Sequence, residues 1–328
     1  MVTKPLSVGP FPQGMNNRLP DSQLKLSKEE GGGQLLRDAV NVDVTARGTV
    51  KRRAGATLAH AGLNCHSGWS PRGGAFMLYA DAGDLFRLDL KPDGTAAREQ
   101  IAAGYGRATP VVFTEVNEAV YFTDGLRVGS YHPVAGPTPQ WLGTAPRLVG
   151  DVQFSAMPAG SSIAHHGARL LVAVGSALIY SEPFTPNLRD ESRGFEIFPA
   201  EITGIAAVEG GVFVLSDKTY FLPGGLPAAG GLRAVLPYGA VRGTVGYLPG
   251  DDGAFWMSSR GAVEASPDGS VRNLQEKHLA LAATGQGAMF LRESDGMRQL
   301  ITSLSEPDES RAGVGSYMQA RIVKKDSQ

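Results

Sequence analysis

The sequence predicts an all-β protein, a β-propeller of about five to six blades with an extended N-terminal arm. The first observation behind this prediction is that 43 Gly and 21 Pro are spread along 328 residues. Few windows of a dozen residues lack both, so long helices are hard to place. The second observation is a repeat. A short apolar strand, a tight turn and another apolar strand recur at intervals of roughly 35 to 51 residues, which is typical of propeller blades.

Residues 1–37 differ from the rest of the chain. They contain four prolines and the run SKEEGGG at 27–33, and no hydrophobic period holds for more than a few residues. Such a segment has too few apolar residues to build a core of its own. We therefore expect an extended arm that becomes ordered by lying on its own body or on a neighbour.

A β-hairpin is expected next, over residues 39–53. Val40, Val42 and Val44 alternate with polar residues, which is the period of a half-buried strand. Ala46-Arg47-Gly48 supplies the turn, where Gly48 can adopt a positive φ. Thr49-Val50-Lys51-Arg52-Arg53 forms the return strand. Because a propeller ring needs closure, this hairpin is well placed to complete the last blade.

The propeller body is expected to span residues 38–312, and residues 313–328 form a C-terminal tail. Copies of the hairpin repeat lie at 76–90, 119–133, 169–183, 211–225, 253–267 and 287–301. A further apolar segment precedes some copies, as at 109–117 and 202–210, and would form an inner strand. We expect the aromatic rings in these strands to pack in the core: Phe76, Tyr79, Phe86, Tyr121, Phe122, Tyr180, Phe213, Tyr220, Phe221, Phe255, Trp256 and Phe290.

Composition limits the classes of function. Lys+Arg number 31 and Asp+Glu 32, a net charge of -1, which argues against a protein that coats DNA but leaves room for a local basic patch. The one cysteine, Cys65, excludes a disulfide framework within the chain and a four-cysteine zinc site. We expect folding in a reducing cytoplasm, with no signal peptide and no membrane span.

Candidate catalytic and metal-binding residues are sparse. His165-His166 are adjacent, so on a strand their side chains point to opposite faces and cannot easily hold one ion. Carboxylates that could act as a glycosidase pair all lie beside Gly in apparent turns, where Asp is favoured for backbone reasons: Asp81, Asp84, Asp124, Asp251 and Asp252. The segments KPDGT (91–95) and SPDGS (266–270) are turn sequences. We predict no cofactor, no metal and no catalytic residue.

Basic residues gather at Arg47, Lys51, Arg52 and Arg53, with Lys324 and Lys325 as a second cluster. Two interpretations of the first cluster stay open. It can be a solvated edge that discourages strand addition, or it can contact DNA phosphates or an acidic partner.

Two motifs stand out near the N-terminus. GPFPQGMNNRLPDSQL carries an aromatic-x-x-Gly-x-Asn element in Phe11, Gly14 and Asn16. LRDAVNVDVTARGTVKRRAGATL follows with Ala-x-Asn-Val-Asp from Ala39, a hairpin glycine and an Arg-x-Gly finish from Arg53. These motifs resemble the opening of tailed-phage tail proteins, namely the tail nozzle or head-to-tail stabilisation proteins of short-tailed phages and related virion propellers. The later segment RLLVAVGSALIYSEPFTPNLRD is similar to a propeller strand of such proteins that ends in Ser-x-Pro. The resemblance covers most of the chain as a pattern.

This resemblance implies a structural virion protein without chemistry. Family members form rings, commonly sixfold, around the tail axis, and their arms join neighbouring copies. The expected partners are therefore other copies of the chain, other tail or head-to-tail connector proteins and, transiently, DNA. The expected location is the virion tail, after synthesis in the host cytoplasm. Because this chain is shorter than the usual nozzle protein, a tail-tip, baseplate or fibre-attachment role is also open.

Two alternatives belong to other functional classes. In a receptor- or glycan-binding propeller, exposed Trp69, Trp141 and Trp256 would stack on sugars. In a propeller glycosidase, two carboxylates would face each other about 5–9 Å apart in a central pocket. For the structural role, the expected assembly or partner contacts are Phe11, Asn16, Arg47, Lys51, Arg52, Arg53 and Tyr317.

Overall fold

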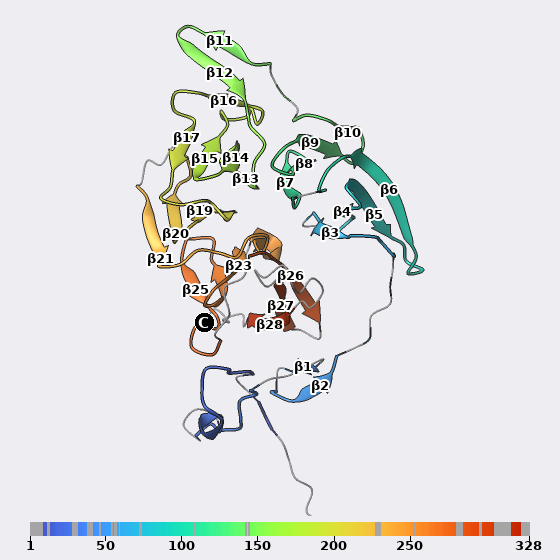
Figure 1. Ribbon diagram of the computed structural model, residues 1–328, viewed down its shortest axis with the longest axis vertical. Coiled ribbons are helices and arrows are strands. Elements are labelled where there is room, and N and C mark those ends of the chain that lie inside the picture. The colour runs from blue at the N-terminus through green and yellow to red at the C-terminus, as the bar shows by residue number, and fades with distance from the viewer. Residues whose placement is uncertain are drawn as a thin grey trace, which may run out of the picture.

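The chain is an all-β protein, here described from a computed structural model (Figure 1). The structure describes residues 9–11, 14–27, 32–37, 42–45, 47–53, 55, 58, 60–71, 74–107, 109–141, 143, 145–226, 231–251, 253–279, 285–294, 297–304 and 316–322. Within these ranges the only helical segments are two short 3₁₀ turns, Asp21–Gln23 and Pro249–Asp251. The rest is strands and loops, as the glycine and proline content predicts.

Five four-stranded antiparallel sheets follow one another along the chain. The first contains β3 (His66–Trp69), β4 (Met77–Asp81), β5 (Asp84–Leu90) and β6 (Ala96–Ala103). The second contains β7 (Val112–Val116), β8 (Ala119–Thr123), β9 (Val128–His132) and β10 (Gly136–Thr138). The third contains β13 (Ser162–His166), β14 (Arg169–Val174), β15 (Ala177–Tyr180) and β17 (Phe195–Ile197). The fourth contains β18 (Gly204–Val208), β19 (Gly211–Leu215), β20 (Thr219–Pro223) and β21 (Arg233–Leu236). The fifth contains β22 (Gly246–Tyr247), β23 (Ala254–Ser258), β24 (Gly261–Ala265) and β25 (Val271–Asn273).

Three smaller sheets complete the described strands. The last sheet contains β26 (Gly287–Ser294), β27 (Met297–Leu304) and β28 (Ser316–Ile322). An inserted sheet contains β11 (Arg147–Val149), β12 (Val152–Ala156) and β16 (Leu188–Asp190). The N-terminal hairpin contains β1 (Val42–Val44) and β2 (Val50–Arg52). The six predicted hairpins are confirmed as β4–β5, β8–β9, β14–β15, β19–β20, β23–β24 and β26–β27.

The core lies between consecutive sheets, which is the packing of a β-propeller. On β19, Val212 and Val214 pack toward the third sheet, whereas Phe213 and Leu215 pack toward the fifth. This division follows from the two-residue period of a strand. Each of the five hydrophobic clusters joins two sheets that are consecutive along the chain. The series begins with the first and second four-stranded sheets and ends with the fifth four-stranded sheet and the last sheet. In Figure 1 the sheets accordingly follow one another around an arc.

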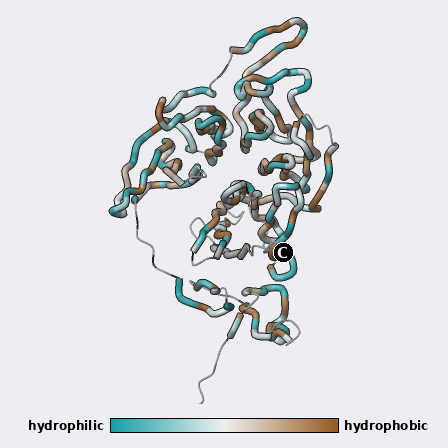
Figure 2. Tube along the Cα trace, turned by 180° about the vertical axis from the view of Figure 1, so that it is seen from behind, coloured by the Kyte–Doolittle hydropathy of each residue, from teal (hydrophilic) through white to brown (hydrophobic). Residues whose placement is uncertain are grey.

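The ends of this arc differ from its middle. None of the five clusters of described residues joins the last sheet to the first. The number of blades therefore stays a prediction. The inserted sheet projects from one end of the molecule in Figure 1, and in Figure 2 its tube carries both hydrophobic and hydrophilic stretches.

The prediction that the Phe290 ring packs in the core is wrong. Phe290 is 57% exposed, whereas its neighbour Met289 is buried against the fifth sheet. Successive residues of β26 point to opposite faces, and the fifth sheet covers only the face that carries Met289. The other rings that the repeat predicts for the core are buried, except Phe86, which is half-buried.

The N-terminal hairpin does not complete the last sheet in the way that the sequence predicts. β1 and β2 pair with each other, and the last sheet contains β26, β27 and β28 alone among the described strands. Asp43 of β1 instead contacts Arg292, on the face of β26 opposite to Met289. The hairpin therefore lies against this face of the last sheet, where the buried Asp43 carboxylate pairs with the Arg292 guanidinium.

The sequence predicts that the propeller body ends at residue 312, but the last sheet extends beyond this residue. Ser316–Ile322 of the expected tail forms β28, which pairs with β27 over seven residues. The segment SYMQARI alternates polar and apolar residues from Tyr317 onward, a period that suits an edge strand of this sheet. The last sheet therefore takes its third strand from the C-terminal segment.

Candidate assembly site

The described part of the N-terminal arm folds back on itself and is bonded to the hairpin. Met15 forms a parallel bridge with Leu36, and Lys25 forms an antiparallel bridge with Gln34. The backbone N–H of Phe11 donates to the carbonyl of Gly48 in the hairpin turn at 2.7 Å. Gly48 has φ of 75°, the positive value that this turn was expected to need. We call residues 9–53 of the described chain the N-terminal unit.

Asn16 stabilises the fold of this unit. Its side chain is 2% exposed, and its Oδ1 accepts hydrogen bonds from the N–H groups of Arg18 and Leu19 at 3.0 and 3.1 Å. This is the local turn that asparagine forms readily. The turn directs the Arg18 guanidinium to the carbonyl of Glu276. The N-terminal unit is thereby attached to the loop after β25.

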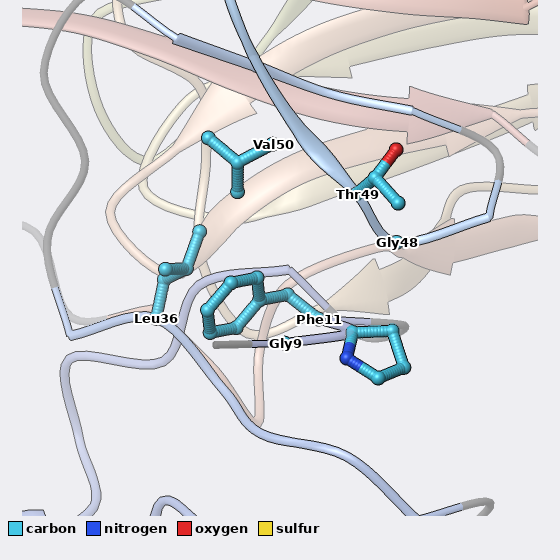
Figure 3. A pocket seen from close by; sticks show the side chains of 7 residues that line it. Gly9, Phe11, Leu36, Gly48, Thr49 and Val50 are labelled. Carbon is cyan, nitrogen blue, oxygen red and sulfur yellow. The ribbon is translucent and has the colours of Figure 1, made fainter. Parts of the chain in front are cut away.

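Phe11 lines an apolar groove between the arm and the hairpin (Figure 3). The groove has a volume of about 600 Å³, and its other lining residues are Gly9, Pro10, Leu36, Gly48, Thr49 and Val50. In Figure 3 the side chains of Leu36, Phe11 and Val50 lie around one space. Val50 remains 40% exposed although it is apolar. The groove is large enough to accept one aromatic side chain of a partner.

The four basic residues of the hairpin do not form one stripe. Cross-strand pairing opposes Asp43 to Lys51 and Val42 to Arg52, so Lys51 and Arg52 lie on opposite faces. Arg53 returns to the Asp43 face, where its Nε lies 3.5 Å from Oδ1. Arg47 is exposed in the turn beside the groove. Strand pairing therefore places Arg52 on the Val50 face of the hairpin and leaves Lys51 and Arg53 on the Asp43 face.

The Asp43 carboxylate joins the hairpin to the last sheet. Its side chain is 5% exposed, and its Oδ2 lies 3.0 Å from Nη2 of Arg292. Arg292 also donates to Gln299 on the neighbouring strand β27. A buried carboxylate needs such partners, because desolvation of an unpaired charge is costly. The sequence suggested no role for Asp43 beyond its place in the motif.

Tyr317, the last of the expected contacts, belongs to the last sheet. It lies in β28, where its backbone pairs with Ser303. Its position is therefore within the last sheet.

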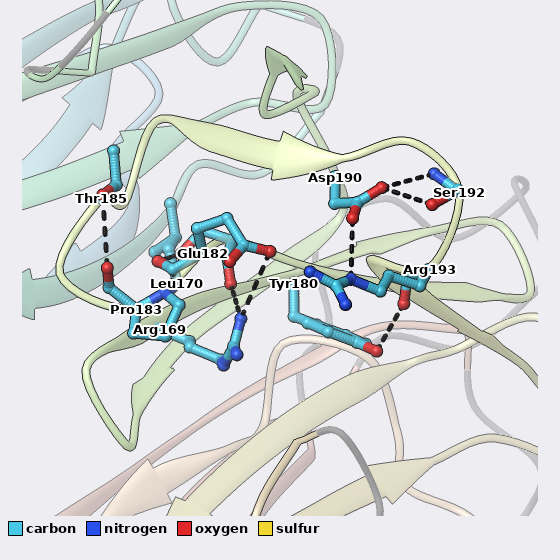
Figure 4. A network of polar contacts seen from close by, with 10 residues as sticks. Arg169, Leu170, Tyr180, Glu182, Pro183, Thr185, Asp190, Ser192 and Arg193 are labelled. Atoms are coloured by element: carbon cyan, nitrogen blue, oxygen red, sulfur yellow. Dashed lines mark hydrogen bonds and ion pairs between the residues drawn. The ribbon is translucent and has the colours of Figure 1, made fainter. Parts of the chain in front are cut away.

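A second polar network stabilises the loop 181–194 (Figure 4), which the sequence did not single out as a site. Asp190 is buried, and its Oδ1 accepts bonds from the N–H and hydroxyl of Ser192 at 2.9 and 2.6 Å. Its Oδ2 pairs with Arg193 at 2.7 Å, and the Tyr180 hydroxyl donates to the Arg193 carbonyl at 2.6 Å. The bonds from Ser192, with the Arg193 charge, lower the pKa of Asp190.

Turn aspartates of the sequence serve the backbone. Asp81 accepts the N–H groups of Asn64 and Leu63 and pairs with Arg98 at 2.9 Å, and these bonds lower its pKa. Asp93 and Asp268 of the two Pro-Asp-Gly turns each accept two bonds from the residue two positions later. Asp252 lies outside the described residues. Burial lowers the pKa of both His165 and His166, and in the described chain no three His, Cys, Asp or Glu side chains gather as a metal site.

The tryptophans expected on a sugar-binding surface are mostly in the core. Trp141 is 5% exposed and Trp256 is 0% exposed, so neither can stack on a sugar. Both lie where two sheets pack together, which is the common place for a large ring. Trp69 is half-buried and lies against Phe113, with 6.0 Å between ring centroids. Among the described segments, no helix is long and apolar enough to cross a bilayer.

Comparisons with known proteins concern the fold only. No family model and no curated protein matches the chain. The extracellular domain of the hybrid two component system BT4673 from B. thetaiotaomicron has 7% identity and a TM-score of 0.47, and the match covers 77% of this chain but 32% of that one. The AfRom2 CNH domain has 10% identity and a TM-score of 0.44 over 82% and 99% of the two chains. Citrobacter koseri AztD has 12% identity and a TM-score of 0.41 over 79% and 90%. These likenesses are weak, and nothing about the function of this chain follows from them.

Proposed function

We propose that this protein is a structural component of a bacteriophage tail, which assembles as a ring or docks on the tail through its terminal segments. The observation that carries the proposal is a juxtaposition. Phe11 and Asn16 of the first tail-protein motif and the hairpin of the second are separate in sequence but form one unit with an apolar groove.

The way this unit is attached supports a role in contacts with other proteins. None of the five hydrophobic clusters includes a residue of the N-terminal unit. Hydrogen bonds and an ion pair connect the unit to the body, through Asn17 and Arg18 to the loop after β25 and through Asp43 to Arg292. A peripheral unit with an open apolar groove is suited to bind a partner, because an exposed apolar surface gains stability when it is covered.

The partners in this proposal are other copies of the chain and other tail or head-to-tail connector proteins, in the virion tail. Arg47 and Arg52 are exposed beside the groove, so the proposal includes transient contact with DNA. Such contact would weaken steeply as salt concentration rises, because phosphate binding releases counterions.

Electron microscopy of negatively stained particles tests this function. The purified chain is imaged alone and after mixing with tail particles that lack it. We expect rings, or discs at one defined place on the tail. Isolated discs that never bind a tail would overturn the tail role. Deletion of residues 1–37 should abolish incorporation, and incorporation at the wild-type level would show that the arm makes no assembly contact.

A further inference from the structure

The turns of the propeller body lie on two opposite sides. Because neighbouring strands are antiparallel, successive turns of a sheet leave it at opposite ends. The sheets follow one another around an arc in Figure 1, so turns of the same kind gather on one side. We define the first face by four turns, at 91–95, 117–118, 209–210 and 266–270. We define the second face by two turns and two loops, at 124–127, 216–218, 104–107 and 274–279.

Hydrogen bonds between sheets support this division. On the first face, the N–H of Gly210 donates to the carbonyl of Pro267 at 2.7 Å, which joins a turn of the fourth sheet to a turn of the fifth. On the second face, Nη1 of Arg127 donates to the carbonyl of Gly104 at 2.9 Å, which joins a turn of the second sheet to the loop after the first. Turns of one face are therefore in contact with each other.

The first face is acidic. Its turns contain four exposed carboxylates that form no ion pair with any other described residue: Asp93, Glu118, Glu209 and Asp268. Hydrogen bonds from Thr95 and from Ser270 lower the pKa of Asp93 and of Asp268, so both are ionised at neutral pH. Lys91 is the one cation in these four turns.

The second face is basic. Its segments contain four exposed cations that form no ion pair within the described part of the chain: Arg107, Arg127, Lys218 and Lys277. Of the carboxylates there, Glu276 pairs with Arg260 at 3.2 Å and Asp124 is buried, which leaves Asp217 as the one exposed carboxylate outside an ion pair. The unpaired exposed charges of the two faces are therefore opposite in sign.

Glu118 lies where a glutamate is strained. Asn117 and Glu118 form the two-residue turn between β7 and β8, with φ of 49° and 67°. A hairpin turn with positive φ at both positions strongly favours Asn-Gly. Glycine at position 118 would relieve the strain, so the fold holds an exposed carboxylate on the first face at the expense of stability. Strained residues of this kind cluster at functional sites.

We propose that two copies of this chain associate through these faces, with the acidic first face of one copy against the basic second face of the other. This inference rests on the proposed function, which names other copies as partners, and it specifies the surfaces that meet. Opposite charges across an interface steer association and select the surfaces that pair. Two first faces or two second faces would repel each other, so contacts between like faces are disfavoured.

A second copy of the chain suits both faces at once, whereas nucleic acid would be attracted by the second face and repelled by the first. In Figure 1 the strands β1 and β2 and the strands β11 and β12 lie at the two ends of the long axis, outside the arc of sheets, and in this view they leave the arc uncovered. A contact between two different surfaces is heterologous. It therefore continues as a stack, or closes into a ring when the rotation allows it.

Sedimentation velocity of the full chain over a concentration series, at low and at high salt, tests the inference. We expect self-association that weakens as salt rises, because salt screens surface charges. The variants Glu118→Lys/Glu209→Lys and Lys218→Glu/Lys277→Glu should each weaken association roughly 10-fold or more at low salt. The control Glu99→Lys/Asp151→Lys makes the same change of charge as the first variant, on the outer strand β6 and in the turn between β11 and β12, and should leave association unchanged.

Mixing the two double variants provides the sharper test. The Lys218→Glu/Lys277→Glu chain retains its acidic first face, and the Glu118→Lys/Glu209→Lys chain retains its basic second face. An equimolar mixture should therefore associate at least as strongly as the wild type, while each variant alone associates weakly. A monomeric wild type, association that survives both double variants, or a mixture without complexes would each overturn the inference.

Glu118→Gly separates the contact from the fold. Its melting temperature should rise, because glycine suits the turn, while association should weaken roughly 2-fold or more. Unchanged association would overturn the role of Glu118 in the contact. A monomeric chain that binds a duplex DNA probe through Lys218 and Lys277 would overturn the inference in favour of nucleic acid. Double variants that still dock on tail particles would leave the proposed function intact, whereas self-association without any docking would remove the tail role alone.

Discussion

Trp256 shows how burial decides the role of a residue whose type allows two roles. Its ring packs between the fourth and fifth sheets, and its centroid lies 5.5 Å from that of Phe213. The sequence alone allowed a sugar-stacking surface residue or a core residue. The structure assigns it to the core, because both faces of β23 are covered.

We expect Trp256→Ala to lower the free energy of unfolding by about 3–5 kcal/mol, through lost burial and the cavity that remains. Chemical denaturation measures this change. Trp69→Ala is the matched control, and its loss should be smaller because Trp69 is only half-buried. Equal losses for the two variants would contradict the packing described above.

Asp190 should make stability depend on pH. Its pKa is lowered in the folded protein by the bonds from Ser192 and by Arg193, so its stabilising effect is present above the pKa of the unfolded chain and is lost as pH falls through the folded value. Asp190→Asn should therefore lower the melting temperature more at pH 7 than near pH 3. Calorimetry at both pH values tests this, with the exposed Asp151→Asn as control. An equal loss at both values would show that the charge of Asp190 is unimportant.

At the scale of elements, the sequence predicted the hairpins, but it did not predict which other strands or sheets they pair with or pack against. The short apolar runs of β19 and β23, each bounded by turn residues, can be recognised in the local sequence. The pairing of β28 with β27 could not be predicted in this way, because a segment between them separates the strands and pairing depends on which sheet edge is free. The N-terminal hairpin was recognised for the same local reason as the others, but its docking depends on Arg292, about 250 residues later in the chain.

The Asp43–Arg292 pair should govern how firmly the hairpin is held. Asp43→Asn keeps the size of the side chain but leaves the Arg292 charge without its carboxylate partner. We expect amide hydrogen exchange in residues 42–52 to accelerate roughly 10-fold or more, with no change in β19. Asp21→Asn breaks the exposed pair between Asp21 and Arg37 and should have little effect on the hairpin. Unchanged exchange in 42–52 would show that other contacts hold it.

At the scale of the whole molecule, stability is distributed over interfaces between consecutive sheets. Because no residue of the N-terminal unit belongs to these clusters, deletion of residues 1–37 should leave the body folded. We expect the main melting transition to move by no more than about 4 °C. Differential scanning calorimetry checks this, and loss of the transition would show that the arm is part of the folding core. The same variant tests assembly, so stability and incorporation can be separated.

The sequence by itself determined the fold class and the position of the hairpins, because strand period and turn chemistry are local properties. It also indicated Phe11, Asn16 and the basic residues of the hairpin as expected contacts. Only the tertiary structure decided which faces are covered. It placed Trp141 and Trp256 inside and Phe290 outside, paired Asp43 with Arg292 and held Glu118 at a positive φ. The physical reason is that burial and charge pairing depend on residues far apart in the chain, which local patterns do not specify.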